Sequence, residues 1–151
     1  MKIKPQKTGE LTELGELIED MSVATLTTFD GAEGMLMSRP ISPLEMCEQG
    51  AIWFLADSSS NKVKHLQVMN LDFSNESDST YVSISGHGEV VDDRARIESL
   101  WTVFAKPWFP NGMNASNLAL PKFVPHSAEY WDAPNSKMVR MLAMAASIVA
   151  A

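Results

Sequence analysis

The chain has 151 residues, of which 45% are hydrophobic and 21% are charged, so it is long enough for one domain, residues 1–151, with an apolar core. A net charge of −7 and a pI near 4.9 argue against nucleic acid or an anionic membrane surface as partners, because clustered cations bind both. The single cysteine rules out an internal disulfide and a cysteine-based zinc site. The N-terminal residues lack the apolar core of a signal peptide, and we expect a cytoplasmic location.

The first third of the sequence predicts a helix followed by strands. Apolar residues recur at helical spacing over residues 11–21, and Thr8 or Thr12 is placed to cap this helix. Asp30 and Gly31 form a pair that is typical of a hairpin, here with a loop longer than two residues. Strands are predicted over residues 23–29, 35–41 and 51–56.

The longest predicted strand covers residues 80–91. Its alternation places Val82 and Ile84 on one face and Tyr81 and Ser83 on the other. The other predicted elements are a short helix after residues 58–60, a helix capped by Asp92 or Asp93, strands over 71–74, 118–124 and 127–131, and a final helix from about residue 136.

Two glycines inside the long strand, Gly86 and Gly88, predict a bulge or a sharp coiling of that strand. The whole pattern contains six or seven short strands with helical insertions and no alternation of strands with helices. It therefore predicts a mainly β fold, built as a closed or nearly closed antiparallel barrel.

Two cations lie where a phosphorylated cofactor could use both. Arg39 belongs to the predicted strand over residues 35–41, and Lys62 follows Ser60 at the expected start of a helix. A helix N-terminus beside two positive charges is a good phosphate site. Surface ion pairs with some of the 19 acidic residues would explain the same two cations. The residues alone leave both interpretations open.

Two tryptophans outside the predicted core pattern are candidate ligand contacts. Trp108 lies in a proline-flanked loop, which is typical of an interface or ring-stacking wall and also of an aromatic that closes one barrel end. Alternation places Glu129 and Trp131 on one face of a strand and Tyr130 on the other. Trp131 is thus either a contact for a planar ligand or a structural residue.

The three histidines, His65, His87 and His126, fall on three different predicted elements, and no two of them have metal-ligand spacing. We therefore expect no metal site and interpret all three as surface or supporting residues. The sequence also lacks the glycine motifs of nucleophile elbows, dinucleotide sites and phosphate-binding loops.

An ordered set of stretches gives the chain a resemblance to a known family. The stretches are Ser38-Arg39-Pro40, Trp53-Phe54-Leu55 with Ser60-Asn61-Lys62, residues 81–86, residues 108–112 with residues 128–132, and residues 136–140. From about Leu11 to the end, the chain resembles the general stress protein 26-like branch of the pyridoxamine 5′-phosphate oxidase-like, FMN-binding split-barrel proteins.

The resemblance implies a split barrel that forms a homodimer and binds FMN between its two subunits. It also implies that Arg39 and Lys62 hold the FMN phosphate, with Ser60 and Asn61 beside it. By the same resemblance, the flavin ring would lie along the strand that carries Arg39, against Ser38, Pro40 and Ile41. Leu55 and Ala56 would present backbone groups to the edge of the ring. The aromatic residues Tyr81, Trp108 and Trp131 would approach the flavin, the two tryptophans at the dimer seam.

The function implied is that of a flavin-dependent oxidoreductase acting on a small molecule. Only Lys137 falls near a position that the true oxidases use to grip vitamin B6 phosphate, which argues against pyridoxamine phosphate oxidation. The alternatives are a non-catalytic flavin binder that serves as a stress sensor, buffer or carrier, a split barrel that holds haem or a deazaflavin, and a barrel without a cofactor.

Overall fold

A computed structural model describes residues 1–59, 65–102 and 105–132 in full and the backbone of residues 137–141. Within these residues the fold is mainly β, with ten strands and two helices. The helices are α1 (Gly9–Ile18) and α3 (Arg94–Leu100). The strands are β1 (Lys2–Ile3), β2 (Ala24–Asp30), β3 (Met35–Ile41), β4 (Glu45–Met46), β5 (Ile52–Trp53), β6 (Ala56–Asp57), β7 (Met69–Asn75), β8 (Thr80–Val91), β9 (Leu118–Asp132) and β10 (Lys137–Met141).

The strands form one curled sheet in the order β1-β4-β5-β9-β8-β7-β2-β3, with β6 and β10 also paired to β9. All pairings are antiparallel except that of β1 with β4. The last strand of this order, β3, has a partner on one side only, and residues 42–44 connect it directly to β4. This arrangement is the antiparallel split barrel that the sequence predicts.

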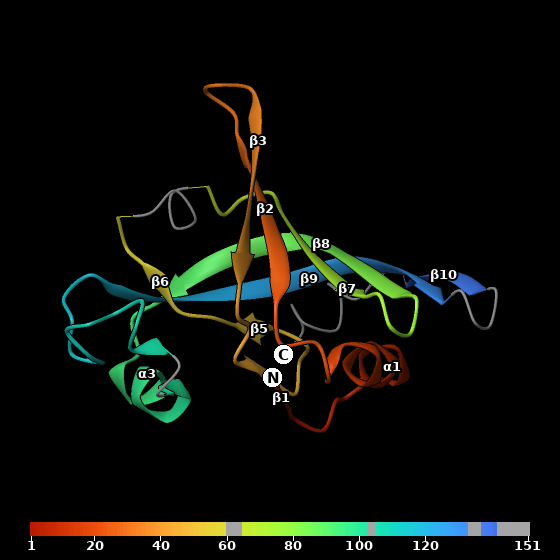
Figure 1. The fold of residues 1–151 in the computed structure, drawn as a ribbon, viewed down its shortest axis with the longest axis horizontal. Helices are drawn as coiled ribbons and strands as arrows, with labels where there is room; N and C mark the ends of the chain where they lie inside the picture. The colour runs from red at the N-terminus through yellow and green to blue at the C-terminus, as the bar shows by residue number, and fades with distance from the viewer. Residues whose placement is uncertain (60–64, 103–104, 133–136, 142–151) are drawn as a thin grey trace.

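Two long strands, β8 and β9, run along the molecule and contribute side chains to two apolar cores (Figure 1). The larger core packs α1 through Leu11, Leu14 and Ile18 against the sheet. The smaller core packs α3 through Ile97 and Leu100 against the start of β9. The two helices lie on the same side of the β8–β9 pair, at opposite ends, and the β2–β3 hairpin rises from the other side (Figure 1).

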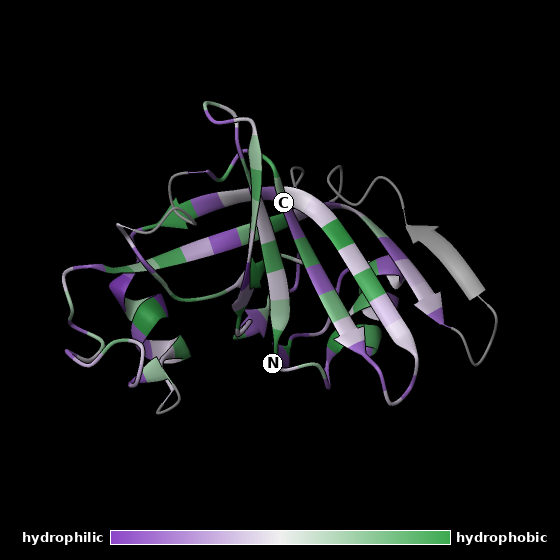
Figure 2. Cartoon of the chain, turned by 45° about the horizontal axis from the view of Figure 1, so that its top comes forward, coloured by the Kyte–Doolittle hydropathy of each residue, from purple (hydrophilic) through white to green (hydrophobic). Residues whose placement is uncertain are grey.

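Local sequence signals account for these elements. The Thr8 side chain caps α1 by accepting a hydrogen bond from the Leu11 amide, and Asp93 caps α3 in the same way. Alternating hydropathy along β7 and β8 buries one face of the sheet, and Figure 2 shows it as bands of opposite colour. The hairpin at Asp30 closes through a four-residue turn that ends at Gly34, whose φ is 68°.

The predicted strand over residues 51–56 is two short strands, β5 and β6. Both pair with β9, but Pro121 lies opposite the gap between them. Proline has no amide hydrogen, so the ladder is interrupted there. The predicted strands over 118–124 and 127–131 are, conversely, one continuous strand, β9, which passes the break at residues 125 and 126 as a bulge.

The helix predicted from residue 136 is wrong over residues 137–141, which form strand β10 and pair with residues 128–132 of β9. Helix-favouring residues such as methionine are overridden here because β10 covers an otherwise open sheet edge. The first half of the helix predicted after residues 58–60 falls on residues 60–64, outside the described residues. Its second half is wrong, because residues 65–68 are not helical and Met69 begins β7. The strand total exceeds the predicted six or seven because β1, β4, β5 and β6 have only two residues each, too few to show a period.

Candidate functional site

Arg39 is a half-buried cation whose partners among the described residues are all neutral. Its Nη1 atom donates to the Met37 carbonyl at 2.7 Å, and its Nη2 atom donates to Thr28 Oγ1 at 2.7 Å. Its Nε atom is buried and finds no acceptor among the described residues. Partial burial lowers the pKa of the Arg39 guanidinium, although the group remains charged at neutral pH. An arginine in this setting is a fitting partner for an anion.

The β3 strand sends its side chains to two faces. Arg39 shares the inward face with Ile41, which is buried, and it lies opposite Leu26 of β2. Ser38 and Pro40 point outward, and the Ser38 hydroxyl lies 2.8 Å from the Thr27 hydroxyl. The structure therefore brings these four predicted residues together on β3, with Arg39 and Ile41 on its inward face.

Two further predicted residues lie between β5 and the start of the predicted phosphate helix. Leu55 is half-buried against the smaller core, and Ala56 is buried in the larger one. The chain that follows is anchored by Asp57, which accepts from the Ser59 amide at 2.8 Å and from Asn117 Nδ2 at 2.8 Å. The other three residues predicted to hold the phosphate lie outside the described residues: Ser60, Asn61 and Lys62.

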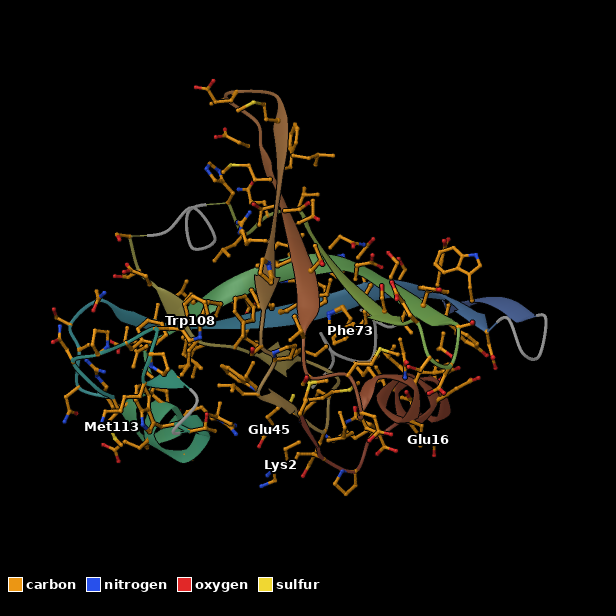
Figure 3. All side chains as sticks on the ribbon, in the orientation of Figure 1. Lys2, Glu16, Glu45, Phe73, Trp108 and Met113 are labelled. Atoms are coloured by element: carbon orange, nitrogen blue, oxygen red, sulfur yellow. The ribbon has the colours of Figure 1, made fainter. Side chains whose placement is uncertain are left out.

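The aromatic residues predicted to contact the ring fall in two places. Tyr81 and Trp131 are cross-strand neighbours on the exposed face of β8 and β9, with 38% and 37% of their surface accessible. Trp108, which is 80% exposed, lies at the other end of β9, on the α3 side of the molecule (Figure 3). Because residues 118–131 of β9 span about 40 Å at about 3.3 Å per residue, one chain does not bring both tryptophans to one ring.

A cavity of about 320 Å³ opens at the corner where β2 leaves β7. One part of its wall is apolar, and the other consists of hydroxyl, amide and imidazole groups. Thr28, the acceptor for Arg39, also lines this cavity, so the cation lies one side chain away from it. The apolar wall includes Phe29, Leu36 and Val68, and the polar wall includes Asn70, Ser85 and His126.

His87 and His126 meet in the structure, which their sequence positions do not predict. His87 Nδ1 lies 2.6 Å from His126 Nε2, and His87 Nε2 lies 3.2 Å from Glu89 Oε1. The other oxygen of this carboxylate, Glu89 Oε2, lies 3.2 Å from Lys122 Nζ. The signal for this contact is the pair of glycines that flank His87, because a bulge beside them shifts the facing strand by one residue.

His65 stands apart from this pair, 3.5 Å from Asp30 Oδ2 at the turn end of the β2–β3 hairpin. No group of three or more histidine, cysteine, aspartate or glutamate residues is arranged to hold a metal within the described ranges. The helices in the same ranges also lack the length and apolar character that a membrane-spanning helix requires.

Comparison with known proteins identifies the family. Residues 9–151 match the model of the family described as pyridoxamine 5′-phosphate oxidase like. The chain belongs to this family, as its split barrel and its arginine on the edge strand lead one to expect. A search of the curated proteins finds no match.

Solved structures show the same fold. A protein related to general stress protein 26, from Clostridium acetobutylicum, is 21% identical, with a TM-score of 0.73 over 87% of this chain and 93% of that one. The general stress FMN/FAD binding protein of Xanthomonas citri is 25% identical, with a TM-score of 0.68 over 83% of this chain and 90% of that one. A heme binding protein of Mycobacterium smegmatis is 13% identical, with a TM-score of 0.69 over 95% of this chain and 61% of that one.

Proposed function

We propose that the protein binds FMN and that Arg39 holds the phosphate. The observation that carries this proposal is the Arg39 guanidinium, half-buried with neutral partners and a buried Nε–H that lacks an acceptor. A dianionic phosphate would supply both the missing acceptor and the missing charge. The FMN/FAD binding stress protein of X. citri, which shares the fold, supports the choice of a flavin.

Lys62, Ser60 and Asn61 complete the phosphate site in this proposal. In the sequence these three residues come directly after the segment anchored at Asp57. The flavin ring then lies along Ser38, Pro40 and Ile41 at the free edge of β3. In the same proposal, Leu55 and Ala56 offer backbone groups to the ring edge.

We also propose that a homodimer completes the site. Tyr81, Trp131 and Trp108 lie on exposed surfaces away from Arg39, and one chain keeps the two tryptophans at opposite ends of β9. A two-fold related copy can present such a surface to the Arg39 end of its partner. Exposed aromatic side chains of this kind are typical of interfaces that exclude water from a shared ligand.

The activity that fits best is that of a flavin-dependent oxidoreductase on a small molecule. The flavin supplies the electron-transfer chemistry, while the chain binds the phosphate, orients the ring and restricts the access of water to the ring. A non-catalytic flavin binder would share the same binding residues. Steady-state NAD(P)H oxidation with FMN bound separates the two, because the carrier or sensor does not turn over.

The heme binding protein of M. smegmatis gives a specific reason to consider haem as the second candidate. Haem needs an axial ligand, and the histidines of this chain are the natural donors. A Soret band after addition of haem, lost with a histidine substitution, would favour this candidate over FMN.

The phosphate assignment is tested by titrating the protein with FMN and following the flavin fluorescence. We expect Arg39→Ala to weaken FMN binding by about thirtyfold, equivalent to about 2 kcal/mol for a charge-assisted contact. Arg94→Ala is the matched control, because Arg94 is exposed on α3 and bonds only to the Met113 carbonyl among the described residues. Unchanged FMN affinity in Arg39→Ala would remove the assignment.

The shared site is tested by sedimentation with and without FMN. The dimer should have twice the 16.6 kDa chain mass. A monomer that retains tight FMN binding would contradict the proposed contribution of the second copy.

A further inference from the structure

We propose that His87 and His126 form a binding site for a divalent transition metal of the Cu(II) and Ni(II) class. The two imidazole nitrogens face each other at 2.6 Å on adjacent strands, at the surface and beside the cavity. Imidazole is a preferred ligand of these metals, and two imidazoles that converge on one point form the core of such a site. The inference is independent of FMN binding.

The backbone is shaped to bring the two imidazoles together. Ser85 pairs with Ser127 and Gly86 pairs with Pro125, so His126 is the extra residue of a bulge in β9. A side chain at Gly86 is impossible, because its Cβ atom would lie 2.0 Å from the Val124 carbonyl oxygen. In a regular ladder His126 would pair with Gly86, and its side chain would point to the face of the sheet opposite to that of His87. A bulge re-aims a side chain, and here His126 meets His87.

The Glu89 carboxylate contacts the His87 imidazole on the side that faces away from His126. Glu89 Oε1 lies 3.2 Å from His87 Nε2, the nitrogen that does not face His126. The other carboxylate oxygen, Glu89 Oε2, lies 3.2 Å from Lys122 Nζ. Metal-ligating histidines commonly donate their second N–H to such a carboxylate, which fixes the tautomer and leaves the other nitrogen free to bind the metal.

The separation of the two nitrogens favours square over tetrahedral coordination. With metal–nitrogen bonds of about 2.0 Å, two nitrogens 90° apart lie about 2.8 Å from each other, whereas tetrahedral ligands lie about 3.3 Å apart. The observed 2.6 Å needs only a small opening to reach the first value. This geometry is typical of Cu(II) and Ni(II), and the other positions are left for water or a ligand from the adjoining cavity.

The third histidine provides a matched control. His65 also faces a carboxylate, Asp30, but no second imidazole lies near it in the described part of the chain. A metal that binds any exposed histidine would bind His65 as well. A metal that needs two converging nitrogens would depend on His87 and His126 alone.

The test is a calorimetric titration of the full chain with NiCl2, and with CuSO4 for pulsed electron paramagnetic resonance. We expect His87→Ala and His126→Ala each to weaken Ni(II) binding at least tenfold, and Glu89→Ala by about tenfold. His65→Ala should leave the affinity within twofold of the unaltered protein. The spectrum of the unaltered Cu(II) protein should show two coupled imidazoles.

Three results would overturn the proposal. One is Ni(II) affinity retained in the double variant His87→Ala/His126→Ala, and another is an equal loss in His65→Ala. The third is a Cu(II) spectrum of the unaltered protein with a single coupled imidazole, a readout that needs no variant to fold.

Discussion

Two half-buried arginines, one in each part of the molecule, have opposite surroundings. Arg96, on α3, lies 3.3 Å from the Glu45 carboxylate, which is only 5% exposed, and its guanidinium carbon lies 5.1 Å from the centre of the Trp53 ring. Arg39, on β3, bonds to one carbonyl and one hydroxyl and leaves its Nε atom without an acceptor. The first cation is neutralised within the chain, and the second lacks an anion among the described residues.

The presence or absence of a carboxylate partner among the described residues distinguishes a structural arginine from a candidate ligand-binding arginine. Burying a cation costs free energy unless an anion or several hydrogen bonds compensate. Arg96 has that compensation from Glu45, so its removal should mainly affect folding. Arg39 has only part of it, so its removal should mainly affect binding. Stability and FMN affinity, measured on the same variants, therefore distinguish the two roles.

The largest effect is expected for Arg96→Ala. This change leaves the buried Glu45 carboxylate without its cation, and we expect the free energy of unfolding to fall by about 3 kcal/mol, the lower end of the range for a broken buried pair. Urea unfolding at pH 7 measures it. Adding Glu45→Gln to Arg96→Ala should restore part of the loss. If Arg96→Ala unfolds like the unaltered protein, the pair is not structural.

The second effect concerns stabilisation by the ligand. At an FMN concentration 100 times its Kd, the unaltered protein should gain about 2.7 kcal/mol against unfolding. Arg39→Met should lose most of this gain and yet equal the unaltered protein within about 0.5 kcal/mol without FMN, because it removes a cation that has no anionic partner in the part of the chain that the structure describes. Thermal unfolding with and without FMN measures both. A large loss of stability without ligand would place Arg39 with Arg96 as a structural charge.

Much of the fold follows from the sequence because its signals are local. Strand β3 was predicted at its observed bounds, and so was β8, whose alternating faces are confirmed. Where the prediction was wrong, distant pairing decided the outcome: Pro121 interrupts the ladder that splits β5 from β6, and an open edge of β9 recruits β10. Both causes lie in β9, outside the segments of sequence whose structure they change.

The candidate site was less predictable from the sequence, because its contacts also depend on pairing between distant segments. Placing Arg39 on a strand required only local pattern, but its neutral partners come from register with β2, as the bond to Thr28 shows. The meeting of His87 with His126 depends on a one-residue shift between β8 and β9. A bulge has no fixed sequence spacing, so residues 39 positions apart gave no sign of contact.

A smaller effect is expected for Thr28→Val, which keeps the side-chain shape but removes the acceptor for Arg39 Nη2. The guanidinium is then less well held before FMN binds, and we expect about fivefold weaker FMN binding, close to 1 kcal/mol. FMN titration measures it. Thr25→Val is the control, because Thr25 lies on the same strand and points outward. Equal affinity in both variants would mean that Thr28 does not position Arg39.

The last comparison uses the hydrogen bond between Tyr130 and Glu13, a polar contact that forms without any ligand. Tyr130, 5% exposed on β9, donates its hydroxyl to Glu13 Oε1 of α1 at 2.7 Å. This hydrogen bond, with burial and nearby carboxylates, raises the pKa of Tyr130 to about 12 from the ordinary 10.0. The neutral phenol is thus favoured in the folded state, so the contact stabilises the fold below pH 10, weakens as the pH rises from 10 towards 12, and is lost above that.

We therefore expect Tyr130→Phe to lower the free energy of unfolding by about 1 kcal/mol at pH 7 and at pH 9, and by less at pH 11. Urea unfolding at these three pH values measures the difference. Tyr81→Phe, at the only other tyrosine of the chain, is exposed and should change stability little at pH 7. A Tyr130→Phe difference that is the same at pH 11 as at pH 7 would show that the hydrogen bond to Glu13 is not what holds the proton.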